Sequence, residues 1–162
     1  MKRIWAPWRS PYLKHLGNRE DDEGCVLCKI PEARDEERYI LKRGKLCYVV
    51  LNLYPYNNGH LMIVPYRHVS SLTGLTVEES AELMDLTSES LRALEAGLKA
   101  DGYNIGANLG KLAGAGIADH FHFHVVPRWG GDTNFIPVIG DTKVISAPLE
   151  ETYEKVRPHF KG

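Results

Sequence analysis

The pattern of apolar and polar residues predicts short extended segments in the first half of the chain. Residues 46–53 are rich in Val, Leu and Tyr, residues 54–59 are mostly turn formers, and residues 60–65 are again apolar. Short runs of this composition are typical of β-strands, and so short a connection allows only an antiparallel hairpin. We expect residues 38–42 to add a weaker strand before the hairpin.

The longest periodic segment, residues 76–100, is predicted to be an amphipathic helix. Thr76, with Glu79 three residues later, has the pattern of a capping box, and Asp101-Gly102 ends the helix. Apolar residues recur along it at helical spacing, namely Val77, Met84, Leu91, Leu94 and Leu98.

The remaining segments predict two more strands and a terminal helix. Residues 103–109 are expected to form a strand, 110–119 a glycine-rich loop, 120–127 the central strand and 148–160 a short helix. Strands before and after one long helix indicate a single α+β domain with a mostly antiparallel sheet.

Length and composition fit one cytoplasmic domain. The 162 residues suffice for an apolar core, and we divide them into an N-terminal arm (1–20), a core (21–145) and a C-terminal segment (146–162). With 20 basic against 21 acidic residues, charge gives no reason to expect a nucleic-acid polymer or a membrane as partner. Since no run resembles a signal peptide or a membrane span, we expect a cytoplasmic protein.

Three histidines alternate with apolar residues in the predicted central strand. Side chains alternate between the faces of a strand, so His120, His122 and His124 would line one face. The residues expected on the core side are Phe121, Phe123 and Val125. Because imidazole can bind a metal, transfer a proton or attack as a nucleophile near neutral pH, this face is predicted to be a functional site.

Two of the three cysteines have the spacing of half a zinc site. Cys25 and Cys28 are separated by two residues, and such a pair is commonly completed by two histidines. His68 is one candidate, and with His120 the set would close, which leaves the other two histidines for chemistry. A redox motif and two unconnected buried thiols are the alternatives.

The run HFHFHVV resembles the signature of the histidine-triad (HIT) family of nucleotidyl hydrolases and transferases. Further likeness lies in VLNLYPYNNGHLMIVPYRH, NIGANLG and VVPRWGGDTNF, which are similar to the branch of diadenosine tetraphosphate phosphorylases and fragile-histidine-type hydrolases. The resemblance implies a HIT-like fold and a diadenosine polyphosphate, such as diadenosine tetraphosphate (Ap4A), as substrate. The run CVLCKI is similar to zinc-bearing members, which implies a structural zinc on Cys25, Cys28, His68 and His120.

The resemblance also implies roles in the reaction. His122 matches the nucleophile, which would form a nucleotidyl-histidine intermediate with its other ring nitrogen held by a backbone carbonyl. His124 matches a contact to phosphate and to neighbouring histidines, and His60 matches a fourth histidine of the active site.

Substrate contacts are implied on two further segments. Asn52 matches the residue that contacts the ribose, and Asn108 matches an asparagine at the phosphate end of its strand. The loop that contains Gly114 and Gly116 would present backbone N–H groups to phosphate oxygens.

One departure from the family pattern leaves the acceptor open between water and phosphate. Hydrolases of the family usually carry Gln-Ser or Gln-Thr shortly before the first triad histidine, whereas this chain has Gly116-Ile117. Two alternative functions also stay open, and the missing hydroxyl bears on the second. One is a zinc hydrolase whose three triad histidines bind the metal and whose zinc-bound hydroxide attacks, and the other is a nucleotide-binding adaptor with little turnover.

A homodimer, or a dimer of dimers, is expected from both physics and resemblance. The strand 103–109 would leave an unpaired edge, and the helix 76–100 presents an apolar stripe. Similar family members pair these elements across a twofold axis.

Overall fold

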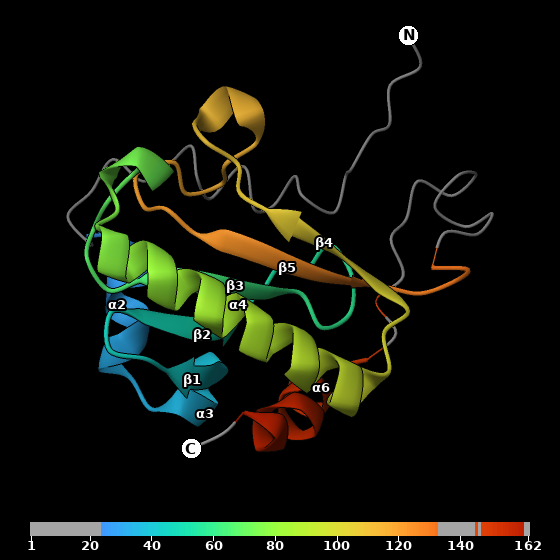
Figure 1. The fold of residues 1–162 in the computed structure, drawn as a ribbon. Helices are drawn as coiled ribbons and strands as arrows, with labels where there is room; N and C mark the ends of the chain where they lie inside the picture. Colours follow the sequence, from blue (N-terminus) through green and yellow to red (C-terminus); the bar gives the residue numbers. More distant parts are fainter. Residues whose placement is uncertain (1–23, 133–144, 146, 161–162) are drawn as a thin grey trace, which may run out of the picture.

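A computed structural model of the protein describes residues 24–132, 145 and 147–160. Within these residues an antiparallel sheet of five strands has the order β1-β2-β3-β5-β4, and the long helix α4 crosses one face (Figure 1). This arrangement confirms the predicted α+β architecture. The expected N-terminal arm, 1–20, lies outside the described residues, as do residues 133–144.

The first three strands confirm the hairpin and the weaker strand before it. They are β1 (Ile40–Arg43), β2 (Cys47–Leu51) and β3 (Leu61–Pro65). All residues of β2 and β3 are buried, because both faces of the sheet are covered at this point.

Helix α4 (Val77–Leu98) begins and ends as its sequence predicts. The Thr76 hydroxyl accepts a hydrogen bond from the Glu79 N–H, and the Glu79 carboxylate accepts one from the Thr76 N–H, which completes the capping box. The helix ends at Lys99 in the left-handed conformation, with φ of 52°.

The apolar residues expected at helical spacing on this helix do not all pack on the sheet. Met84 is 51% exposed and Val77 is 81% exposed, so neither faces the sheet. The side that packs on the sheet combines leucines with small residues at spacings of three and four, namely Leu83, Leu86, Ser90, Ala93 and Leu94. Two of these residues are small or polar, so hydrophobicity alone does not reveal this side of the helix. The side that packs on the sheet is turned around the helix axis from the predicted apolar residues by about the angle between successive residues.

Two apolar layers flank the sheet. One lies between the sheet and α4, together with α6 (Leu149–Val156) and the short helix η5 (Arg157–His159), which confirm the predicted terminal helix. The other lies under Leu27 of the N-terminal helix α2 (Val26–Lys29). The sequence did not predict α2, the turn η2 (Ile30–Glu32) or α3 (Asp35–Arg38), each of which has only three or four residues.

The last two strands are shorter than expected or shifted along the chain. β4 (Gly102–Gly106) ends three residues before the predicted 109, and β5 (Phe123–Arg128) begins three residues after the predicted 120. β5 pairs with β3 only as far as Phe123 opposite Ile63. Two positions further, the register would reach Pro65, which has no N–H for the ladder. His120 and His122 therefore precede the central strand instead of lying on it.

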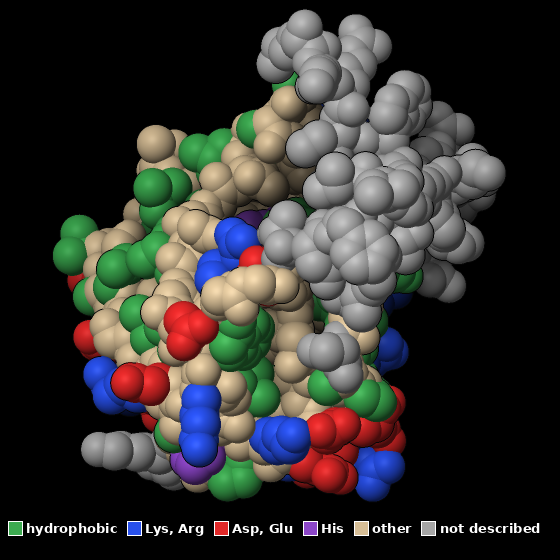
Figure 2. All heavy atoms as spheres, turned by 90° about the vertical axis from the view of Figure 1, so that its right-hand side faces the viewer, with side chains coloured by type: hydrophobic (Ala, Val, Ile, Leu, Met, Phe, Trp, Pro, Cys, Tyr) green, Lys and Arg blue, Asp and Glu red, His purple; other side chains and the backbone are tan. Residues whose placement is uncertain are grey.

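The face shown in Figure 2 carries both basic and acidic side chains. None of the described helices is both long enough and apolar enough to cross a membrane.

Candidate active site and metal centre

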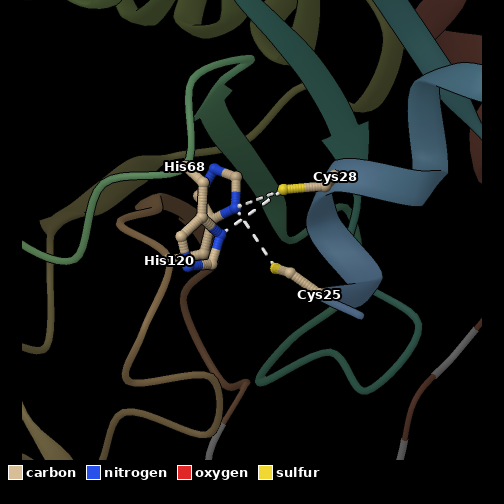
Figure 3. A group of neighbouring side chains, drawn as sticks. All are labelled: Cys25, Cys28, His68 and His120. Carbon is tan, nitrogen blue, oxygen red and sulfur yellow. Dashed lines mark hydrogen bonds between the residues drawn. The ribbon is translucent and has the colours of Figure 1, made fainter. Parts of the chain in front are cut away.

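Four potential metal ligands converge from three parts of the chain. Cys25 caps α2 and Cys28 lies on its first turn, His68 follows β3, and His120 precedes β5 (Figure 3). Their ligand atoms all lie within 4.8 Å of one another. The structure thus brings together the four residues predicted to form the metal site.

The donor atoms of this cluster are oriented by hydrogen bonds. The His120 Nε2–H donates to the Pro65 carbonyl at 2.9 Å, which leaves the lone pair of Nδ1 facing Cys25 Sγ at 3.3 Å and Cys28 Sγ at 3.4 Å. The His68 Nδ1 lies 3.4 Å from Cys28 Sγ. A ligand histidine in a metal site is typically oriented by a carbonyl in this way.

The proximity of the two thiols favours the binding of a cation between their sulfur atoms. Burial and the neighbouring Cys25 raise the pKa of the Cys28 thiol, which disfavours its thiolate in the absence of a positive charge. A bound cation supplies that charge and deprotonates its thiol ligands. Two thiols and two imidazoles at this separation can therefore hold a metal ion.

The nucleophile predicted from the sequence has a defined tautomer. The His122 Nδ1–H donates to the His120 carbonyl at 2.9 Å, so the lone pair lies on Nε2. His122 is 6% exposed, and burial lowers the pKa of its imidazole, so that the ring is neutral near neutral pH. A neutral imidazole with an unprotonated Nε2 can act as a nucleophile.

His60 and His124 form a hydrogen-bonded pair. The Tyr56 backbone N–H donates to His60 Nδ1 at 3.0 Å, so the His60 proton lies on Nε2, which donates to His124 Nδ1 at 2.9 Å. The proton of His124 then lies on its own Nε2. The ring of His124 meets that of His122 edge to face, with centroids 4.9 Å apart.

The predicted substrate residues fall into two groups, Asn52 at His60 and the others in the loop that follows β4. The Asn52 Nδ2 lies 3.3 Å from His60 Nδ1, and its Oδ1 accepts from the Tyr54 N–H. The Asn108 Nδ2 donates to the Gly114 carbonyl at 3.5 Å, which closes the loop carrying η4 (Lys111–Ala113). Gly114, with φ of 92°, takes a conformation that favours glycine. Gly116 is half-buried in the same loop, and the nucleotide contacts of these residues stay predictions.

The zinc-hydroxide alternative is not supported by this geometry. Among the residues that the structure describes, the cluster of potential ligands contains His120 but neither His122 nor His124. The other two rings direct their Nδ1 atoms to a carbonyl and to His60 instead.

Three groups that shape the site were not predicted from the sequence. The carbonyls of Pro65 and Val69 hold the triad segment, the latter by accepting the Phe121 N–H at 2.6 Å. The Tyr56 ring lies 4.5 Å from that of His60. Every residue has a backbone carbonyl, so the sequence does not show which carbonyls act as acceptors. Tyr56, four residues before His60, could have been predicted as a neighbour of His60 from its position in the turn.

Comparison with known proteins agrees with this arrangement. Residues 34–131 match the family model of the HIT domain. An AP-4-A phosphorylase of Mycobacterium tuberculosis is 48% identical over 157 residues, which cover 94% of this chain and 80% of that protein. An adenosine 5'-monophosphoramidase of Saccharomyces cerevisiae is 31% identical over 107 residues, 66% of this chain and 64% of that protein.

A solved structure extends the likeness to the fold. A Zn-bound histidine triad family protein from Mycobacterium smegmatis superposes with a TM-score of 0.69 at 28% identity, over 85% of this chain and 93% of that one. Three buried alternating histidines at the start of the central strand of an antiparallel sheet are the feature that this chain shares with the histidine-triad pattern. The chain belongs to the HIT domain family, which confirms the resemblance found in the sequence.

Proposed function

We propose that this protein is a nucleotidyl hydrolase or transferase that cleaves a diadenosine polyphosphate such as Ap4A. The observation that carries the proposal is the hydrogen bond from His122 Nδ1 to the His120 carbonyl, because it leaves Nε2 as a nucleophile. The 48% identical AP-4-A phosphorylase supports the choice of substrate.

The proposed reaction has two steps. His122 Nε2 attacks one α-phosphorus of Ap4A, a P–N bond forms, and the P–O bond to the rest of the polyphosphate breaks to release ATP. Water or inorganic phosphate then attacks the same phosphorus, breaks the P–N bond, and releases AMP or ADP.

The hydrogen-bonded pair of His60 and His124 supplies a proton donor next to the nucleophile. With its proton on Nε2, His124 would donate to a phosphate oxygen whose negative charge grows in the transition state. His60 fixes that tautomer, because its own Nδ1 accepts the Tyr56 N–H. Asn52 would contact the ribose, while Asn108 and the loop of Gly114 and Gly116 would contact the phosphates.

The metal centre fits zinc. Two cysteines and two histidines form a common donor set for structural zinc, and the similar protein from Mycobacterium smegmatis is Zn-bound. Zinc held by Cys25, Cys28, His68 and His120 would stabilise the N-terminal helices against the sheet. Elemental analysis should give about one zinc per chain.

The product pattern tests the proposed activity. Incubation with Ap4A and inorganic phosphate should give ADP plus ATP if phosphate is the acceptor, and AMP plus ATP if water is. Gly116-Ile117 departs from the Gln-Ser or Gln-Thr of the family's hydrolases, and the 48% identical relative is a phosphorylase, so we expect phosphate as the acceptor. Nucleotide binding without any product would contradict the proposed activity and favour an adaptor.

A homodimer in the cytoplasm is the assembly we infer. β4 lies at the edge of the described sheet. Three apolar side chains are exposed nearby in the chain or on the long helix: Ile105 on β4, Leu109 after β4, and Met84 on α4. Light scattering should give the mass of two or four chains. Ile105→Glu should lower that mass, while Leu72→Glu, at an equally exposed leucine on the helix η3 (Leu72–Gly74), should not. A single-chain mass for the unmodified protein would contradict the dimer.

A further inference from the structure

The proposed nucleophile lies outside the hydrogen bonding of the sheet. β5 begins at Phe123, opposite Ile63, and this register would place Phe121 opposite Pro65, which has no N–H. The backbone of residues 120–122 must therefore be held by other contacts.

One set of contacts comes from the segment that carries the metal ligand His68. The Val69 carbonyl accepts the Phe121 N–H at 2.6 Å, and the Pro65 carbonyl accepts the His120 Nε2–H at 2.9 Å. On its other side, the His120 ring faces the sulfur atoms of Cys25 and Cys28. The same short stretch is thus fixed between β3 and the metal cluster.

His120 belongs to both sites. Its ring is part of the metal cluster, while its carbonyl oxygen accepts the Nδ1 proton of His122 at 2.9 Å. Any rotation of the backbone at this residue moves the carbonyl and, with it, the hydrogen bond that selects the tautomer of His122. An error of about 1 Å in the place of a reacting group can cost about 100-fold in rate.

We propose that Cys25, Cys28 and His120 are positioning residues for His122, so that metal binding fixes the tautomer and aim of the nucleophile as well as the fold. The inference rests on the proposed role of His122. It assigns the metal more than a structural role, because it predicts that folded protein without the metal loses turnover.

The first experiment compares the metal-loaded protein with protein stripped by a chelator. Circular dichroism gives the folded fraction, and kcat per folded chain should fall about 10- to 100-fold while KM for Ap4A changes little. Added zinc should restore kcat. The control is Leu86→Ala in α4, on the opposite face of the sheet, which should lower stability but leave kcat per folded chain unchanged.

If the stripped protein unfolds, a second experiment uses two variants that each keep four metal donors. His120→Cys and His68→Cys both offer three cysteines and one histidine, which is also a zinc donor set. At equal metal content, His120→Cys should lose far more kcat, because it removes the bond to Pro65 and shortens the side chain within the 120–122 stretch. Equal kcat in the two variants would overturn the proposal.

The tautomer of His122 gives a readout that needs no turnover. At about pH 8.5, where an ordinary imidazole is neutral, ¹⁵N-histidine spectra of loaded protein should place the His122 proton on Nδ1. Stripped protein, or His120→Cys, should give a mixture of tautomers, and an unchanged pattern with unchanged kcat would overturn the proposal. If the loaded protein does not turn over Ap4A, the proposed function fails, while the ¹⁵N comparison still decides the positioning.

Discussion

His120 and His124 stand at the two ends of one triad, yet they serve different sites. The ring of His120 lies in the potential metal cluster with Cys25 and Cys28, whereas the ring of His124 accepts a hydrogen bond from His60. His122 lies between them and touches both, through the His120 carbonyl and the edge of the His124 ring. The alternating motif thus joins two half-sites, one with the metal cluster and one with His60, that meet at the proposed nucleophile His122, and we expect that each half can be disturbed separately.

Removing His122, the proposed nucleophile, should have the largest effect on turnover. His122→Ala eliminates the atom that forms the P–N bond, so we expect less than about 1% of the unmodified kcat, with fold and metal content retained. Steady-state kinetics with Ap4A measures this loss. His159→Ala, at an exposed histidine of η5, is the matched control and should keep full activity. Substantial turnover by His122→Ala would mean that another group attacks.

Breaking the metal half should reduce stability strongly. Cys25→Ser with Cys28→Ser removes both sulfur ligands, and metal-binding free energy is also folding free energy. Thermal unfolding should shift down by about 10 °C or more, since each 1 kcal/mol is worth about 2–4 °C at this size. Cys47→Ala, at a buried cysteine outside the cluster, should cost only about 1 kcal/mol and keep the metal. Full metal content in the double variant would refute the ligand assignment.

Breaking the other half should slow the reaction and leave the metal in place. His60→Ala removes the donor to His124 Nδ1, so the proton of His124 is no longer confined to Nε2. We expect kcat to fall about 10- to 100-fold, with unchanged zinc content by elemental analysis. Loss of metal in this variant would show that the two halves are not separable.

The smallest effect concerns Glu79, which stabilises the loop that follows His68. Hydrogen bonds from Arg67, together with the Thr76 N–H, lower the pKa of this carboxyl below its usual 4.5. A depressed pKa stabilises the fold above pH 4.5, and this contribution is lost as the pH falls through the folded-state pKa. Glu79→Gln should therefore cost about 1 kcal/mol at neutral pH and progressively less in acid.

Denaturant unfolding at several pH values measures this difference. Glu154→Gln on the exposed side of α6 is the matched control, for which little change is expected at any pH. A Glu79→Gln deficit that does not shrink in acid would contradict the assignment to the ionised carboxylate.

The sequence predicted the parts of the fold that local chemistry determines. The hairpin, the capped helix α4 and the terminal helix follow from runs of β-formers, a capping box and helical spacing. The four residues of the potential metal cluster were also named from the sequence: spacing indicated the half-site of Cys25 and Cys28, and the family resemblance implied His68 and His120. The roles of the other histidines rest on that resemblance and stay predictions.

The sequence could not predict features that depend on tertiary contacts. The late start of β5 follows from its register against Pro65, and the face of α4 that packs on the sheet includes Ser90 and Ala93. The short helices around Cys25 form where the chain packs on Tyr48, whose hydroxyl donates to the Leu27 carbonyl. Neither register nor a carbonyl acceptor is encoded in local periodicity.

The covalent intermediate tests the central claim most directly. Ap4A labelled at its α-phosphates should be mixed with the protein for a few milliseconds to seconds and quenched without acid, since phosphorus on imidazole is acid-labile. Peptide mapping and ³¹P NMR then identify the residue and the ring nitrogen that carry the label. Our account predicts adenylate on Nε2 of His122, because Nδ1 donates to the His120 carbonyl. Label on His124, on Nδ1 of His122, or on no residue while turnover continues would contradict it.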